Sequence, residues 1–378
     1  LMTLTRLLKE EVKMTLEQLT KCNSNTKSRE TMIIGLIVAA LLSISCQKSN
    51  DSFSLLAEQS SFQQSSSFEV SKIDILWVID NSGSMKTSQD NLISNFNSFI
   101  QRFQTLNYDF NMAFIATDAF IDLTDTSPTG SYKNTYCAGI NKKCSIFRDG
   151  PGKVSTPALH SGVPIISKLT TNIAQIFNLN AAQGIQGYGD ERAFQSFKVS
   201  LQNPLNTGFR RSDAYLAIII VSDEDDFSHN AMTPQLETLP NNGYLTDSRT
   251  HTVASYAQFL DGYTQSTASL KNYSVSAITI TDQACLTELN TTGGRRLGTR
   301  YMQLADMTGG TKASLCGNFG ESLQLISDQV LTLSSAFKLD REPIPETIKV
   351  VVNGVAVQLD PANGWTYDPI NITVNFHG

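Results

Sequence analysis

The sequence has no cluster of lysine or arginine residues, and this absence argues against a nucleic-acid partner. Its 29 Lys and Arg are outnumbered by 35 Asp and Glu, which gives a formal net charge of −6. Nucleic-acid binding depends on basic patches that neutralise phosphates. A content of 40% apolar and 17% charged residues is typical of a globular chain, and 378 residues are enough for one large domain or two unequal ones.

Several motifs of hydrolytic enzymes and zinc proteins are also missing. No serine lies in a G-x-S-x-G nucleophile elbow. No histidine lies at a ligand spacing from the cysteine pairs, so a zinc site is not expected. The histidines show no pairing and are interpreted as surface or satisfied residues: His160, His229, His251 and His377.

No apolar run is long enough to span a bilayer, which takes about 20 helical residues. Met32–Ser45 has 14 residues, the length of a signal-peptide core, and basic residues come just before it. It ends in small residues followed by Cys46, and LLSISC resembles a bacterial lipoprotein signal. This resemblance implies that Cys46 is lipidated and that the chain is anchored in the cell envelope of a Gram-negative-type bacterium. Because Gln47 follows, the outer membrane is expected; the alternative is a plain secretory signal.

Changes in composition along the sequence predict four segments. Residues 47–71 are rich in Ser and Gln and are interpreted as a flexible tether. The last 40 residues begin with a Pro-rich spacer, and Asn353-Gly354 between two apolar runs predicts a hairpin. The expected segments are an extension with signal peptide (1–46), the tether (47–71), the main domain (72–338) and a small β appendage (339–378).

Cysteine usage fits an exported protein. Cys22 would be lost with the signal and Cys46 would carry lipid, which leaves an even number in the domain. Pairing of sequence neighbours gives Cys137–Cys144 and Cys285–Cys316, which close loops of 8 and 32 residues. In the chain-entropy model these bonds contribute about 2.5 and 3.7 kcal/mol.

Apolar strands alternate with amphipathic helices over most of the main domain. This alternation predicts an α/β fold: a doubly wound, mostly parallel Rossmann-like sheet with helices on both faces. Residues 119–165 are rich in Gly, Pro, Ser and Thr and are interpreted as an irregular insertion. The expected strands are Ile73–Ile79, Phe110–Thr117, Tyr215–Val221, Tyr273–Thr281 and a short one before Cys316; the expected helices are 92–106, 166–179, 190–203, 251–263, 298–307 and 319–337.

The two most apolar strands both end in aspartate. Asp80 follows the first and Asp223 follows Tyr215–Val221, so both should lie at the carboxyl edge of the sheet, where such folds bind ligands. Ser82 and Ser84 add two hydroxyls around a tight turn. Hard oxygen ligands without His or Cys select Mg²⁺, Mn²⁺ or Ca²⁺. The acidic run Val221–Ser228 is otherwise interpreted as a solvated loop, with only Asp223 assigned to the metal.

The stretch Asp80-Asn81-Ser82-Gly83-Ser84 after an apolar strand resembles the metal-ion-dependent adhesion site of von Willebrand factor A-type domains. That motif is Asp-x-Ser-x-Ser, completed by a distant Thr and a distant Asp. The resemblance implies that Asp80, Ser82, Ser84 and Asp223 hold a divalent cation, with Mg²⁺ foremost. In place of the Thr this sequence offers Asp190, either as a further ligand or as a cap of the next helix.

Asp118 ends the second strand on the same edge and is read either as a residue supporting the metal ligands or as a surface acid.

The family resemblance implies a binding or adhesion module, not an enzyme, which engages a protein or other macromolecule through an acidic side chain. Two alternatives stand beside it: an envelope scaffold with an incidental metal site, and a Mg²⁺-dependent phosphatase of the haloacid dehalogenase type. That phosphatase family needs a second acid two residues after the first, where this sequence has Ser82.

Overall fold

A computed structural model of the chain describes residues 72–105, 108–153, 159–267, 271–291, 294–334, 336–339, 342–352, 354–369 and 372–376. The expected signal peptide, Cys46 and the tether lie outside these residues, as does Asn353 of the expected hairpin turn. Among the helices of the described part, none has the length and apolar character needed to cross a bilayer.

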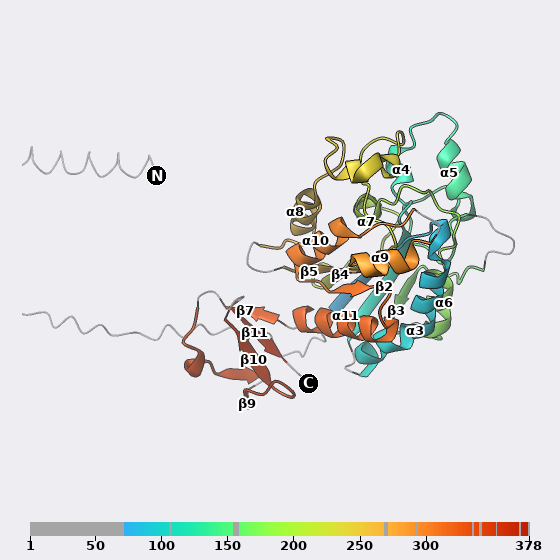
Figure 1. Ribbon diagram of the computed structural model, residues 1–378. Helices are drawn as coiled ribbons and strands as arrows, with labels where there is room; N and C mark the ends of the chain where they lie inside the picture. Colours follow the sequence, from blue (N-terminus) through green and yellow to red (C-terminus); the bar gives the residue numbers. More distant parts are fainter. Residues whose placement is uncertain are drawn as a thin grey trace, which may run out of the picture. The chain divides into compact units, whose positions relative to one another are not determined.

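A six-stranded sheet forms the centre of the main domain, in the order β3-β2-β1-β4-β5-β6 (Figure 1). All neighbouring pairs are parallel except β2 and β3, which run antiparallel. The predicted doubly wound α/β fold is therefore confirmed. The strands are β1 (Lys72–Ile79), β2 (Asp109–Ala116), β3 (Ile165–Ser167), β4 (Tyr215–Val221), β5 (Tyr273–Thr279) and β6 (Lys312–Ser314).

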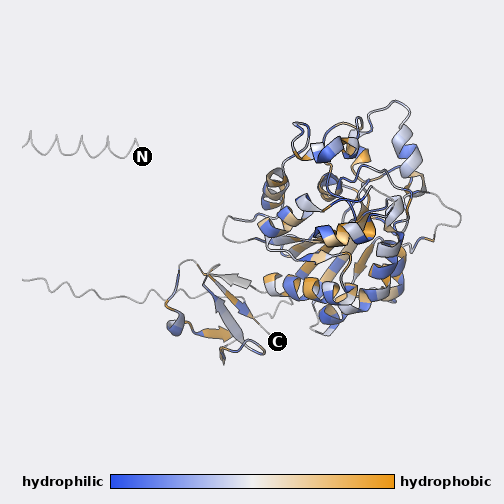
Figure 2. Ribbon diagram, viewed as in Figure 1, coloured by the Kyte–Doolittle hydropathy of each residue, from blue (hydrophilic) through white to orange (hydrophobic). Residues whose placement is uncertain are grey.

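Helices cover both faces of this sheet, because the inner strands carry apolar side chains on both sides. Figure 2 shows that the strands at the centre of the domain are largely hydrophobic. One face of β1, which includes Trp77, packs under α3, α6 and α11, and the other face, which includes Val78, packs under α7, α8 and α10. The helices are α3 (Lys86–Thr105), α6 (Ile173–Ala181), α7 (Ala193–Gln202), α8 (Val253–Tyr263), α9 (Gln283–Leu289), α10 (Thr299–Thr308) and α11 (Phe319–Ser334).

The segment 119–165 is less irregular than its composition indicates. It contains the short helices α4 (Ile121–Thr124) and α5 (Ser131–Tyr136), and it packs around its own small apolar cluster. Cys137 bonds to Cys144 within that cluster, and Cys285 bonds to Cys316, which are the two expected pairings. The insertion leads directly into the edge strand β3.

The expected helix 166–179 begins later than predicted, because residues 165–167 form β3 and α6 starts at Ile173. The expected helix 319–337 ends at Ser334, since residues 336–338 form β7, which pairs antiparallel with β11. The C-terminal segment is built of strands, as expected, with β8 and β9 forming an antiparallel hairpin. Its strands are β7 (Ala336–Lys338), β8 (Val350–Val352), β9 (Val355–Val357), β10 (Trp365–Asp368) and β11 (Thr373–Phe376).

Candidate metal centre

The first half of the site follows from the pairing of β1 with β4. Ile79 and Val221 are partners in the parallel register, so Asp80 and Ser222 leave the sheet side by side. The backbone amide of Asp80 donates to the carbonyl of Val221 at 2.9 Å. The chain continues from β1 to β2 on one side, whereas β4 lies on the other, so this edge is a topological switch point.

The motif turn and the second aspartate are joined by a chain of hydrogen bonds. Asp80 accepts from the backbone amide of Ser82 at 2.8 Å and from the hydroxyl of Ser222 at 2.7 Å. The hydroxyls of Ser82 and Ser84 lie 3.1 Å apart, and Ser84 donates to Asp223 Oδ1 at 2.9 Å. The structure thus brings together Asp80, Ser82, Ser84 and Asp223, the four residues that the motif assigned to one cation.

An arginine that no sequence motif singles out also reaches this site. Arg295 Nε donates to Asp223 Oδ2 at 2.7 Å, and the same guanidinium contacts the carbonyl of Ser84 at 3.3 Å. Asp223 is 1% exposed, so this ion pair is largely shielded from water. One oxygen of Asp223 therefore faces the serines while the other is held by a positive charge.

The loop before α7 closes over the motif turn. The amide of Gly187 donates to the carbonyl of Asn81 at 2.7 Å. The loop then carries Glu191 into the interior, where its side chain is 0% exposed and neither carboxylate oxygen has a hydrogen-bond partner. Asp190 holds the sequence position of the family's Thr, but the residue whose side chain lacks partners in this loop is its neighbour Glu191.

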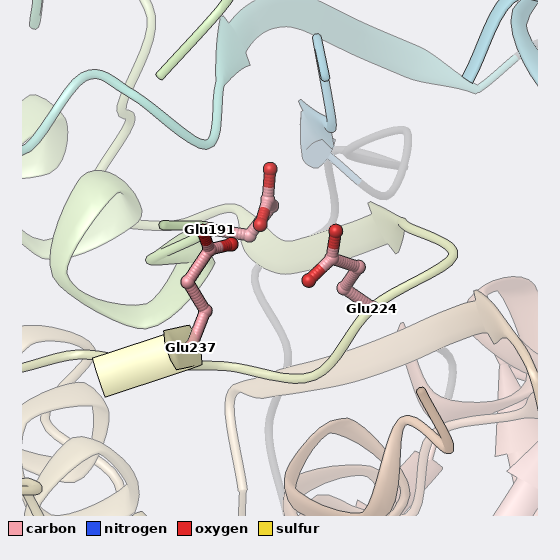
Figure 3. Close-up of side chains that lie close together, drawn as sticks. All are labelled: Glu191, Glu224 and Glu237. Atoms are coloured by element: carbon pink, nitrogen blue, oxygen red, sulfur yellow. The ribbon is translucent and has the colours of Figure 1, made fainter. Parts of the chain in front are cut away.

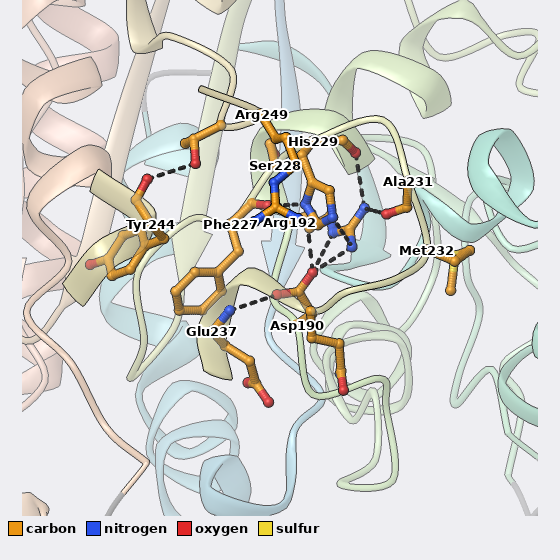
Figure 4. Close-up of polar contacts among 12 residues, drawn as sticks. Asp190, Arg192, Phe227, Ser228, His229, Ala231, Met232, Glu237, Tyr244 and Arg249 are labelled. Atoms are coloured by element: carbon orange, nitrogen blue, oxygen red, sulfur yellow. Dashed lines mark hydrogen bonds and ion pairs between the residues drawn. The ribbon is translucent and has the colours of Figure 1, made fainter. Parts of the chain in front are cut away.

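Asp190 is bound to the protein through both of its oxygens (Figure 4). Arg192 donates to Oδ2 at 2.7 Å, and the backbone amide of Glu237 donates to Oδ1 at 3.1 Å. The first backbone amides of α7 instead donate to other side chains: Phe194 to Asp226, and Gln195 to Ser228. Asp190 therefore does not cap α7, and its observed partner is a buried arginine.

Asp118 is buried at 0% exposure, so its interpretation as a surface acid was wrong. It forms a fully buried ion pair with Arg148 from the insertion, and it accepts a hydrogen bond from the side-chain amide of Asn81 at 2.9 Å. The insertion supplies the cation that the sequence could not assign to this acid. Asp118 stabilises the motif turn through its hydrogen bond with the side chain of Asn81.

The acidic run after β4 is also buried, which contradicts its interpretation as a solvated loop. Asp225 accepts from the Tyr244 hydroxyl at 2.8 Å and from the backbone amide of Arg300 at 2.9 Å, while Asp226 binds the start of α7. These partners lie far away in the sequence. Glu224 differs, because its carboxylate lies with those of Glu191 and Glu237, all within 4.8 Å of one another (Figure 3).

Burial and mutual repulsion disfavour the charged forms of these acids. Burial, with the nearby Asp223, raises the pKa of Asp80 to about 7. Burial, with Asp80 and Glu237, raises the pKa of Glu224 to about 9, and burial with Asp190 raises that of Glu237 to about 7. The pKa of Glu191 lies well above its ordinary value for the same reasons. Protons or a cation would relieve this repulsion.

The donor set fits a hard divalent cation. Asp80 and Asp223 supply carboxylate oxygens and Ser82 and Ser84 supply hydroxyl oxygens, while no sulfur or imidazole ligand belongs to the four. Such oxygen sets suit Mg²⁺, Mn²⁺ and Ca²⁺. The buried Glu191 carboxylate without partners is a further sign of missing positive charge in this part of the chain.

Comparisons with known proteins find only weak structural similarity. No protein-family model matches the sequence, and no curated protein matches it. The chain is similar to the pilus adhesin SpaC from Lactobacillus rhamnosus GG in its open conformation, with a TM-score of 0.39 and 13% identity, covering 71% of this chain and 30% of that one. It is also similar to proximal thread matrix protein 1 from the mussel byssus, with a TM-score of 0.35 and 12% identity, covering 71% of this chain and 49% of that one. The matched region spans less than half of either protein.

Proposed function

We propose that this chain is a binding module that holds a macromolecular partner through a divalent cation, with Mg²⁺ foremost and Mn²⁺ or Ca²⁺ as alternatives. The observation that supports this most is the 2.9 Å hydrogen bond from Ser84 to Asp223, which joins two halves of the site that lie 139 residues apart. With Asp80 and Ser82 they supply four of the five positions of the motif that resembles a von Willebrand factor A-type adhesion site, and this supports the proposal.

The chemistry of the ligands favours binding a partner through the cation. Two of the four proposed ligands, Ser82 and Ser84, are neutral, so a bound divalent cation keeps part of its positive charge. An acidic side chain of a protein or another macromolecule would complete the coordination. Arg295 adds positive charge at the same edge, where it is paired with Asp223.

A binding role agrees better with the surroundings of Asp80 than a phosphatase does. The residue two positions on is Ser82, whose hydroxyl is not an effective general acid near neutral pH. Asp80 accepts hydrogen bonds from Ser82 and Ser222, and neither of these partners is an acid that could protonate a leaving group. We therefore propose that the module does not act as an enzyme, and a phosphatase activity lost in Asp80→Asn would refute this.

The two disulfides indicate an exported protein, because such bonds persist in oxidising compartments. We propose that the module belongs to the cell envelope and is anchored to the outer membrane by lipid on Cys46, with residues 47–71 as the tether. Labelling with a fatty-acid analogue tests this directly: Cys46→Ser is expected to abolish incorporation and release the protein from the membrane fraction. Incorporation that survives Cys46→Ser would contradict the anchor.

The cation is tested by calorimetry on the full chain after treatment with a chelator. Wild type is expected to bind Mg²⁺, Asp80→Asn to lose binding, and Ser84→Ala to bind more weakly. Asp90→Asn is the matched control, because Asp90 is exposed on α3 and pairs only with Lys86 among the ion pairs described. If none of the three ions binds, or if Asp80→Asn binds Mg²⁺ as wild type does, the proposal fails.

The partner is approached by a pull-down with the wild-type chain, carried out in Mg²⁺ and in chelator. Proteins retained in Mg²⁺, released by chelator and not retained by Asp80→Asn are candidates for the partner. Retention that is equal in both buffers would favour the alternative of a scaffold whose metal site is incidental.

A further inference from the structure

Three glutamates from separate segments meet next to the four-ligand site. Glu191 comes from the loop before α7, Glu224 from the end of β4, and Glu237 from the short helix η3 (Leu236–Thr238). Figure 3 shows their side chains converging, and one oxygen from each lies within 4.8 Å of the others. Carboxylates so close together repel one another unless protons or a cation lie between them.

Glu191 provides an independent sign that something is bound there. Its side chain is 0% exposed, points into this cluster, and has no hydrogen-bond partner on either oxygen. Its neighbours Asp190 and Asp226 are equally buried, yet both have hydrogen-bonded partners. A buried carboxylate without partners is costly, and native structures rarely leave one unexplained.

The arginines near the cluster are engaged with other groups. Arg192 pairs with Asp190, and Arg295 pairs with Asp223. Arg296 donates to the side chain of Asn242 at 2.9 Å and to the backbone carbonyl of Glu237. Its guanidinium is close enough to act electrostatically on Glu224 and Glu237, but it forms no ion pair with either carboxylate. None of the ion pairs found in the described part of the chain includes Glu191, Glu224 or Glu237.

We propose that Glu191, Glu224 and Glu237 bind a second divalent cation, Ca²⁺, beside the Asp80–Asp223 centre. Ca²⁺ takes six to eight oxygen ligands at about 2.3–2.6 Å and accepts carboxylates in one- or two-oxygen modes. Oxygens within 4.8 Å of one another can therefore share one such ion. Mg²⁺ demands about 2.0–2.1 Å and retains its water, so a cluster of three glutamates suits it less well.

The second ion would act on the fold of the site and not on the partner. It would fasten η3 to the end of β4 and to the loop before α7, three segments that carry like charges toward each other. Glu237 is only partly buried, which provides a route for entry. This inference rests on the glutamates alone and holds whether or not the proposed binding function is correct.

The test counts calcium sites in the full chain after chelator treatment, by calorimetry and by equilibrium dialysis with ⁴⁵Ca²⁺. Wild type is expected to bind Ca²⁺ at a site that Asp80→Asn retains and that Glu237→Gln loses. With the four-ligand site saturated by Mg²⁺, Ca²⁺ is also expected to raise the melting temperature of wild type but not that of Glu237→Gln. The control is Glu288→Gln, since Glu288 is exposed on α9, outside the cluster.

Two results would overturn the proposal. In the first, Glu237→Gln binds as many Ca²⁺ ions as wild type, with the same affinity. In the second, Asp80→Asn and Glu237→Gln each abolish all calcium binding, which means that one shared site exists. Glu191→Gln is the stricter variant; should it not fold, Glu237→Gln decides alone, because Glu237 lies on a surface helix. Loss of Mg²⁺ binding only in Asp80→Asn tests the proposed function separately.

Discussion

The amide of Gly187 donates a 2.7 Å hydrogen bond to the carbonyl of Asn81, and this contact fixes the loop before α7 against the motif turn. The fit is tight, because a Cβ on Gly187 would lie 2.2 Å from the Asn81 side-chain oxygen. Asn81 in turn donates to Asp118, which pairs with Arg148. The motif turn is therefore held on one side by a glycine contact and on the other by a buried ion pair.

We predict that Gly187→Ala weakens cation binding at the four-ligand site by about tenfold, which equals about 1.4 kcal/mol. The added methyl group must displace Asn81, which lies between Asp80 and Ser82. Calorimetry with Mg²⁺ measures the change. Gly262→Ala is the control, because a Cβ on this helical glycine meets nothing within 4 Å and is expected to be neutral or stabilising. Equal affinity of both variants would show that the loop does not position the turn.

We predict that Asp190→Ala lowers the free energy of unfolding by about 3–5 kcal/mol, because it leaves the buried Arg192 without its carboxylate. The effect is measured by urea denaturation. Asp90→Ala removes an exposed pair with Lys86 and is expected to cost about 0.5 kcal/mol or less. A small loss for Asp190→Ala, accompanied by loss of Mg²⁺ binding, would instead return Asp190 to the metal.

We predict that Arg295→Gln strengthens Mg²⁺ binding by roughly three- to tenfold, because a positive charge is removed from Asp223. The comparison is made by calorimetry at low ionic strength, where charge effects are screened least. Arg102→Gln serves as control, since Arg102 pairs with Asp328 between α3 and α11. Weaker binding in Arg295→Gln would mean that the arginine orients Asp223 rather than competing with the cation.

The strands that carry the site were predictable, and so was the meeting of Asp80 with Asp223. Both aspartates follow long apolar runs, and parallel strands place their carboxyl ends at one edge. The three-residue strand β3 was missed, because so short a segment has no recognisable period next to an expected helix. The start of the following helix, α6, was predicted too early for the same reason.

The inward, unpaired position of Glu191 beside the predicted Asp190 could not be read from the sequence. The two acids are adjacent, and which one turns inward unpaired depends on Arg192, whose guanidinium binds Asp190 and backbone carbonyls of a distant loop. The role of Glu237 was equally hidden, because no pattern links it to Glu224 along the chain. Tertiary contacts of buried charges, and not local propensity, set this part of the site.

The raised pKa values predict how stability depends on pH. Asp80 and Glu237, with pKa values of about 7, and Glu224, at about 9, hold protons more tightly folded than unfolded, where carboxyls titrate near pH 4. Their contribution to stability is therefore fully present below about pH 4 and is lost as pH rises through 7 to 9. Without a cation, the melting temperature should fall between pH 7 and pH 9, above the range where His229 and His251 titrate; burial lowers the pKa of both, so they act in the opposite sense at lower pH.

Saturating Ca²⁺ and Mg²⁺ are expected to reduce this fall, because cations replace the protons that are lost. Part of the fall should persist, since burial raises the pKa of Asp225 to about 7 and its partners are Tyr244 and Arg300.

Cation affinity should rise with pH over the same range, and Glu237→Gln should make the cation-free dependence of melting temperature on pH shallower. Scanning calorimetry in chelator and in cation measures both effects. A melting temperature that rises from pH 7 to pH 9 in chelator would contradict the view that the charged forms of these carboxylates destabilise the fold.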